Sequence, residues 1–205
     1  FSFYSHAARA GSTLAGLAPN TGSDNGTGSA ARFSNPIGIA EGGNGNIYVS
    51  DFNNHTIRKI TTTGSVSTLA GLAESKGNVN GTGSEARFNN PSGLAVDSGD
   101  NIYVAVWGNQ TIRKISPTGI VTTLAGEAGS RGSANGDGSA ARFMYPGGIA
   151  VDKSGNVFVA DTGNQTIRRI TSNGSVSTLA GFPGSRGAAD GTGNVARFSG
   201  PEGVA

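Results

Sequence analysis

The stretch that decides the fold is Val66–Asn90, which reads VSTLAGLAESKGNVNGTGSEARFNN. It returns three more times, in edited form, along the 205 residues. Its TLAG element begins at Thr13, Thr68, Thr123 and Thr178, so successive copies start 55 residues apart. A fixed period of this size is typical of repeat architectures, in which each copy forms one supersecondary unit. The sequence therefore predicts a chain built from copies of a single unit.

Each unit contains four short apolar runs separated by turn residues. In the second unit these runs are 93–96, 101–105, 111–115 and 120–125, and they are rich in Ile, Val, Thr and Tyr. That composition favours strands, and the Gly, Asn and Asp between the runs favour tight hairpins. Four antiparallel strands without a helix predict an all-β propeller blade. We therefore expect one domain with these parts: a partial blade at 1–35, complete blades at 36–90, 91–145 and 146–200, and the start of another at 201–205.

The strand-bearing part of each unit carries a recognisable motif. The copies read PIGIAEGGNGNIYVSDFNNHTIRKI from Pro36, PSGLAVDSGDNIYVAVWGNQTIRKI from Pro91 and PGGIAVDKSGNVFVADTGNQTIRRI from Pro146. They resemble the NHL-repeat β-propeller family, and the long GTGSxARF connection is similar to that of NHL propellers in cell-surface and bacterial secreted proteins. The resemblance implies a propeller that is usually six-bladed and serves mostly as a binding platform. Three complete blades would leave open sheet edges. We therefore expect remaining blades in a longer chain, or self-association.

Positions that recur in every copy are expected to serve the scaffold. The Phe of the ARF motif is expected to fill the seam between blades, and its Arg to pair with a carboxylate or carbonyl of a neighbour. These structural candidates are Arg32, Arg87, Arg142, Arg197, Phe33, Phe88, Phe143 and Phe198. A strand Arg also recurs and suggests a ladder on the sheet face. Asp51 and Asp161 end the second strand in two blades, whereas the middle blade has Val106 there.

Positions that vary between copies are where a binding function is expected. Strand polarity places the turn after the second strand and the long connection on one face, and exposed loops commonly carry function. An aromatic residue in one blade opposite a polar residue in the next suggests a contact surface there. The alternative is that these rings cover the rim or pack on the long connection. The candidate binding residues on this long-loop face are Phe52, Trp107, Met144, Tyr145, Lys76, Arg131 and Arg186.

Composition argues against several other functions. The net charge of +2 and the scarcity of charged residues argue against nucleic-acid binding, and an RNA-binding NHL platform is kept as an alternative. With no Cys and two His, we expect no metal, no cofactor and no enzyme; a metal-dependent propeller lyase or lactonase is the catalytic alternative. No apolar run approaches the roughly 18 residues of a membrane helix, so we expect no membrane insertion.

Six N-x-S/T sequons suggest a glycoprotein. They lie at Asn25, Asn54, Asn80, Asn109, Asn164 and Asn173. Together with the Ser/Thr/Gly-rich, low-charge composition they predict an extracellular or cell-surface protein. The expected function is a non-catalytic interaction or structural module that binds a protein or glycan through the long-loop face and takes part in an extracellular assembly.

Overall fold

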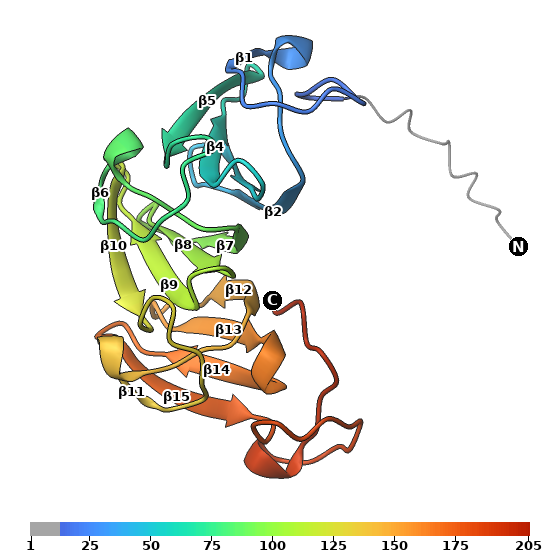
Figure 1. Cartoon of the computed structure of the whole chain (residues 1–205), viewed down its shortest axis with the longest axis vertical. Helices are drawn as coiled ribbons and strands as arrows, with labels where there is room; N and C mark the ends of the chain where they lie inside the picture. The colour runs from blue at the N-terminus through green and yellow to red at the C-terminus, as the bar shows by residue number, and fades with distance from the viewer. Residues whose placement is uncertain (1–12) are drawn as a thin grey trace, which may run out of the picture.

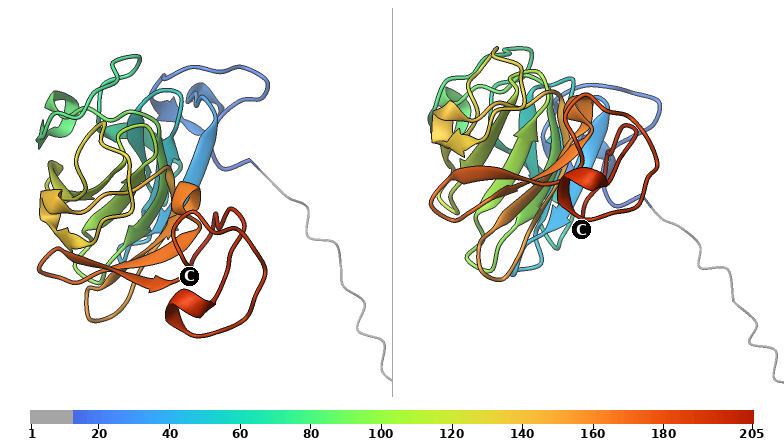
Figure 2. Two further views of the ribbon diagram at one scale, coloured as in Figure 1. Left: turned by 60° about the horizontal axis from the view of Figure 1, so that its bottom comes forward. Right: turned by 90° about the horizontal axis from the view of Figure 1, so that it is seen from below.

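The computed structural model describes residues 13–205, so the beginning of the expected partial blade at 1–35 lies outside the described residues. Three antiparallel sheets follow one another in chain order along an arc (Figure 1). Two further views show that each sheet is twisted and lies against its neighbour (Figure 2). No helix in the described part of the chain is long and apolar enough to cross a membrane.

The first sheet contains β1 (Gly26–Thr27), β2 (Pro36–Glu41), β3 (Ile47–Asp51), β4 (Thr56–Ile60) and β5 (Ser65–Ala70). The second contains β6 (Gly81–Thr82), β7 (Pro91–Val96), β8 (Ile102–Val106), β9 (Thr111–Ile115) and β10 (Ile120–Ala125). The third contains β11 (Gly136–Asp137), β12 (Pro146–Val151), β13 (Val157–Asp161), β14 (Thr166–Ile170) and β15 (Ser175–Ala180). Short 3-10 turns are η1 (Gly28–Ala30), η2 (Gly83–Glu85), η3 (Gly138–Ala140), η4 (Thr162–Asn164) and η5 (Gly193–Val195).

Each blade has five strands, which corrects the expected four. The additional strand comes from the long connection, which leaves the outer strand of one blade and pairs with the outer strand of the next. In the second blade, for example, β6 pairs with β10 through Gly81↔Val121 and Thr82↔Ile120. A two-residue strand that begins with glycine has no strand propensity of its own, so the pattern of apolar residues does not reveal it. It covers part of the otherwise open outer edge.

The hydrophobic core lies in the seams between blades. Phe88 is fully buried among Tyr48 and Ile57 of the first blade and Leu94 and Val104 of the second. Phe143 occupies the same place between the second and third blades. Phe33 and Phe198, in the first and last copies of the connection, are half-buried. The ARF phenylalanine thus lies where two blades share one core.

The arginine of the ARF motif bonds to the connection that carries it. Arg87 donates from Nη1 to the carbonyls of Ser84 and Ala86, closing the 3-10 turn, and the other three copies make the equivalent bonds. Arg142 also pairs with the Glu127 carboxylate. The ARF arginine therefore stiffens the long connection.

The strand arginine does not form a ladder on the sheet. Arg58, Arg113 and Arg168 are fully buried and reach out of their sheets to bind the long connection. Arg58, for example, donates to the carbonyls of Arg32 and Asp24 at 2.8 and 2.9 Å. The carbonyl groups of an exposed loop usually accept hydrogen bonds from water. Here the guanidinium groups donate those bonds instead, so each arginine holds its connection against the blade.

Candidate binding surface on the long-loop face

The turn that follows the second long strand places the candidate aromatic side chains. Its last residue is His55, Gln110 or Gln165, with φ of 59°, 61° and 61°. Each of these side chains accepts an N–H from the start of the next blade. Gln110 Oε1 accepts from the Tyr145 N–H at 2.6 Å, and His55 Nδ1 accepts from the Asn90 N–H at 3.1 Å. Because this bond crosses the seam, it sets where each turn lies relative to the next blade.

Three aromatic side chains meet on this face. Trp107 stacks on Tyr145, with ring centroids 4.4 Å apart and planes inclined by 28°. Phe52 also contacts Trp107, with ring centroids 6.3 Å apart and planes inclined by 60°. Both geometries are favourable for aromatic pairs. Trp107 nevertheless leaves 39% of its surface exposed. We call Phe52, Trp107 and Tyr145 the aromatic cluster; Phe52 and Trp107 follow β3 and β8, and Tyr145 directly precedes β12.

The basic candidates lie on the long connections. The guanidinium of Arg131 lies 4.4 Å from the centroid of the Tyr145 ring, a cation–π contact at the edge of the aromatic cluster. Lys76 lies close enough to His55 that its charge, after burial, contributes to lowering the pKa of that imidazole. All three basic side chains, those of Lys76, Arg131 and Arg186, are exposed, and none pairs with a carboxylate among residues 13–205.

Met144 is not part of the aromatic cluster. Its N–H donates to Asp161 Oδ1 at 2.8 Å, its carbonyl accepts from the Gly163 N–H, and its side chain lies against Gly163. The structure therefore brings together Phe52, Trp107, Tyr145 and Arg131, and places Met144 on the third blade's own turn.

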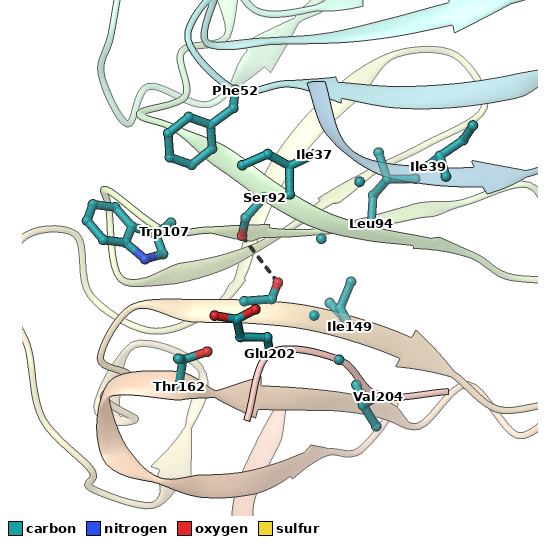
Figure 3. Close-up of a pocket in the computed structure, with 15 residues that line it drawn as sticks. Ile37, Ile39, Phe52, Ser92, Leu94, Trp107, Ile149, Thr162, Glu202 and Val204 are labelled. Carbon is teal, nitrogen blue, oxygen red and sulfur yellow. Dashed lines mark hydrogen bonds between the residues drawn. The ribbon is translucent and has the colours of Figure 1, made fainter. Parts of the chain in front are cut away.

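A groove of about 460 Å³ opens beside the aromatic cluster. Figure 3 shows Phe52 and Trp107 at one end and the apolar side chains of β2, β7 and β12 towards the other. The end away from Phe52 and Trp107 is lined by four equivalent residues, one from each copy of the repeat: Ile39, Leu94, Ile149 and Val204. Thr162 and Glu202 add polar groups. Sequence reasoning missed this groove because its walls are repeated scaffold positions and glycine backbone, which carry no binding signal.

The sequon asparagines fall into two groups. Asn54, Asn109 and Asn164 are buried. Nδ2 of Asn54 donates to the Gly22 carbonyl and to Asp51 Oδ2, both at 2.7 Å, so the folded chain does not expose that nitrogen to a glycosylating enzyme. Asn25, Asn80 and Asn173 are exposed and stay candidates.

Residues 13–205 contain no group of three or more His, Asp or Glu side chains arranged to hold a metal ion.

Comparison with known proteins identifies the repeat and two relatives of the chain. The NHL repeat profile matches residues 33–60, 88–115 and 143–170, in each case from the ARF phenylalanine to the end of the third long strand. Protein SUPPRESSOR OF QUENCHING 1, chloroplastic, of Arabidopsis thaliana is 34% identical over 151 residues, which is 69% of this chain and 14% of that protein. NHL repeat-containing protein 2 of Bos taurus is 31% identical over 151 residues, 67% of this chain and 21% of that protein. The chain thus spans a minor part of these relatives.

Among solved structures, an auxiliary nutrient binding protein from Bacteroides thetaiotaomicron shares the fold. Its TM-score is 0.66 at 19% identity, over 85% of this chain and 43% of that one. With three successive NHL repeats, each supplying the first three long strands of one blade, this chain belongs to the NHL-repeat proteins.

Proposed function

We propose that this chain is a non-catalytic binding module that takes a protein or glycan partner on the aromatic cluster and the adjoining groove. The observation that carries the proposal is Trp107, a large side chain stacked on Tyr145 yet 39% exposed in the middle of the face. Binding energy at interfaces concentrates in such anchors, and Trp and Tyr are the residues most enriched among them.

The repeat itself argues that the aromatic cluster is not needed for folding. Phe52 and Trp107 correspond to Thr162 in the third blade. At this position the Thr162 hydroxyl donates a hydrogen bond to the Pro201 carbonyl at 2.7 Å. Because the same turn forms around a small polar residue, the two rings are explained more simply by contact with a partner than by the scaffold.

An extracellular or cell-surface location is part of the same proposal. The similar Bacteroides protein is described as nutrient-binding, a role that suits a protein exposed to the surroundings of the cell. The exposed sequons at Asn25, Asn80 and Asn173 fit this location in an organism that glycosylates secreted proteins.

The test is a screen of the purified chain on a glycan array and a peptide array, followed by titration of any ligand with Trp107→Ala and Tyr145→Ala. Loss of an anchor costs about 2 kcal/mol or more, which is an affinity loss of about 30-fold. Ile120→Ala is the matched control, because Ile120 is 50% exposed on β10 and does not line the groove.

The expected result is weak binding by Trp107→Ala with an unchanged thermal midpoint, and full binding by the control. Equal affinity of the wild type and Trp107→Ala would refute the assignment. Turnover of the ligand would instead indicate an enzyme.

A further inference from the structure

Each strand arginine contacts an asparagine of the long connection. Arg58 Nη2 donates to Asn25 Oδ1 and Arg168 Nη2 donates to Asn135 Oδ1, both at 2.9 Å. In the middle blade Arg113 Nη2 donates to Asn80 Oδ1 at 2.6 Å. All three guanidinium groups are fully buried. The three blades therefore repeat one arrangement, but the middle blade differs from the other two in the charge beside its arginine.

That difference is a missing carboxylate. Arg58 pairs with Asp51 and Arg168 with Asp161, each at 2.9 Å between fully buried side chains. Val106 takes the place of the aspartate beside Arg113, and no carboxylate within residues 13–205 forms an ion pair with this guanidinium. Its partners are the carbonyls of Arg87, Val79 and Thr122 and the Asn80 amide.

A buried charge without a counter-charge is unfavourable. Burial accordingly lowers the pKa of Arg113 to about 10, which still leaves it charged near neutral pH. The middle blade therefore holds an uncompensated positive charge directly against the Asn80 amide oxygen.

Asn80 is followed by Gly81, the pair of residues most prone to deamidation, because glycine offers no side chain to hinder attack by its own nitrogen. We propose that Asn80 is a deamidation site, and that the aspartate formed there supplies the carboxylate that Arg113 lacks. Asn80 is exposed, so water reaches it.

The reaction needs only water. The Gly81 backbone nitrogen loses its proton and attacks Asn80 Cγ, and the Cγ–Nδ2 bond breaks to release ammonia and leave a succinimide. Water then opens the ring at Cγ to give aspartate, or at the main-chain carbonyl to give isoaspartate. Aspartate is the product that keeps an ordinary backbone and places a carboxylate oxygen where Asn80 Oδ1 lies.

Arg113 favours the attack as well as the product. Negative charge develops on Oδ1 when the nitrogen adds to Cγ, and a buried guanidinium already bonded to that oxygen stabilises it. In the flanking blades Asp51 and Asp161 offset the same guanidinium charge. Asn25 and Asn135 have the same Gly neighbour and the same arginine contact, so they serve as internal controls.

The fourth copy of the connection already contains the product. At the position equivalent to Asn80 it has Asp190, and the glycine that follows has the same backbone φ, 159° at both Gly81 and Gly191. The connection thus forms with an aspartate at this place.

The experiment is to incubate the folded chain at mildly alkaline pH and to follow the deamidated fraction by mass spectrometry of tryptic peptides. Asn80 falls in residues 77–87 and Asn135 in residues 132–142, each with a mass gain of about 1 Da on deamidation. We expect Asn80 to react several-fold faster than Asn135 in the folded chain, and both to react at similar rates in concentrated urea. Equal rates in the folded chain, or a slower Asn80, would overturn the proposal.

Two variants test whether the uncompensated charge of Arg113, rather than the mobility of the connection, sets the rate at Asn80. Val106→Asp supplies the missing carboxylate and is expected to slow Asn80 to the rate of Asn135; an unchanged rate would count against the role of Arg113. Asn80→Asp is expected to raise the thermal midpoint, whereas Asn135→Asp, beside an arginine that is already paired, is not. A midpoint that falls in Asn80→Asp, or rises equally in both variants, would also contradict the proposal.

Discussion

At the scale of single residues, the seam between blades on the long-loop face depends on one side-chain acceptor. A non-glycine residue in the left-handed region costs energy, and it persists where the surrounding contacts compensate. Here the compensation is the N–H that the next blade donates to His55, Gln110 or Gln165. Glutamine accepts this bond at any pH. Histidine accepts it on Nδ1 only when the ring is neutral, so the first seam alone has an acceptor that titrates near neutral pH.

The first seam should therefore weaken at acid pH. Burial and then the charge of Lys76 lower the pKa of His55, while a bond to the Phe52 carbonyl opposes the shift. As the pH falls below the usual value of about 6.5, the unfolded chain takes up the proton first, so the free energy of unfolding decreases. It decreases until the pH passes the folded-state pKa, and above pH 6.5 the stabilisation is fully present.

His55→Gln should remove this dependence, because Gln110 shows that glutamine fits the position. The measurement is the thermal midpoint of both proteins between pH 8 and pH 5. We expect the wild type to lose more stability than the variant on acidification, with the neutral bond itself worth about 1 kcal/mol. Parallel pH profiles would show that His55 does not titrate with folding.

At the scale of elements, the inner strands β2, β7 and β12 approach one another closely because glycine recurs in them. A Cβ on Gly93 would lie 2.5 Å from the Gly147 carbonyl oxygen and 2.9 Å from Gly148 Cα. Gly38 faces the backbone of β7 in the same way, and Gly148 faces the backbone of residues 202–204. The main chain of β12 also donates the Gly148 N–H to the Glu202 carbonyl at 2.7 Å. The blades are thus joined by backbone contact at the inner strands.

Gly93→Ala should force β7 and β12 apart and destabilise the fold. Since the obstructing atoms are backbone and cannot move alone, we expect a cost of about 2 kcal/mol or more, in the range of overpacked cores. Gly203→Ala is the matched control: Gly203 is the fourth copy of this position and has no atom within 4 Å of an added Cβ. Chemical denaturation of both variants tests the point, and equal loss of stability would contradict it.

At the scale of the whole molecule, the four long strands of each blade and their hairpins could be read from the sequence, but the fifth strand could not. Runs such as 120–125 are rich in Ile, Val and Thr and follow a turn glycine, and that composition predicts a strand from the chain itself. The pairing of Gly81 with Val121 depends on how the next blade turns, so no local pattern predicts the fifth strand. For the same reason the sequence placed Phe52, Trp107 and Tyr145 on one face without predicting the stack, and it could not show that Asn54 uses its amide nitrogen internally.

The shared seams make stability depend on contact between neighbouring blades, as in other linear repeat proteins. Phe143 is fully buried between the second and third blades, and the cluster around it includes Tyr103, Ile112 and Ile149. Phe143→Ala should cost about 3–5 kcal/mol, the usual range for a buried phenylalanine. Because the loss falls on one seam, we expect the third blade to unfold separately from the first two.

Hydrogen exchange followed by mass spectrometry should detect this uncoupling. In Phe143→Ala, amides of β12 to β15 should lose protection before those of β3 and β4, whereas in the wild type the two groups should exchange together. Ile120→Ala, which removes an exposed side chain from β10, should leave the exchange pattern unchanged. If Phe143→Ala lowers protection uniformly over all three blades, the molecule unfolds as one cooperative unit and the seams are not its points of separation.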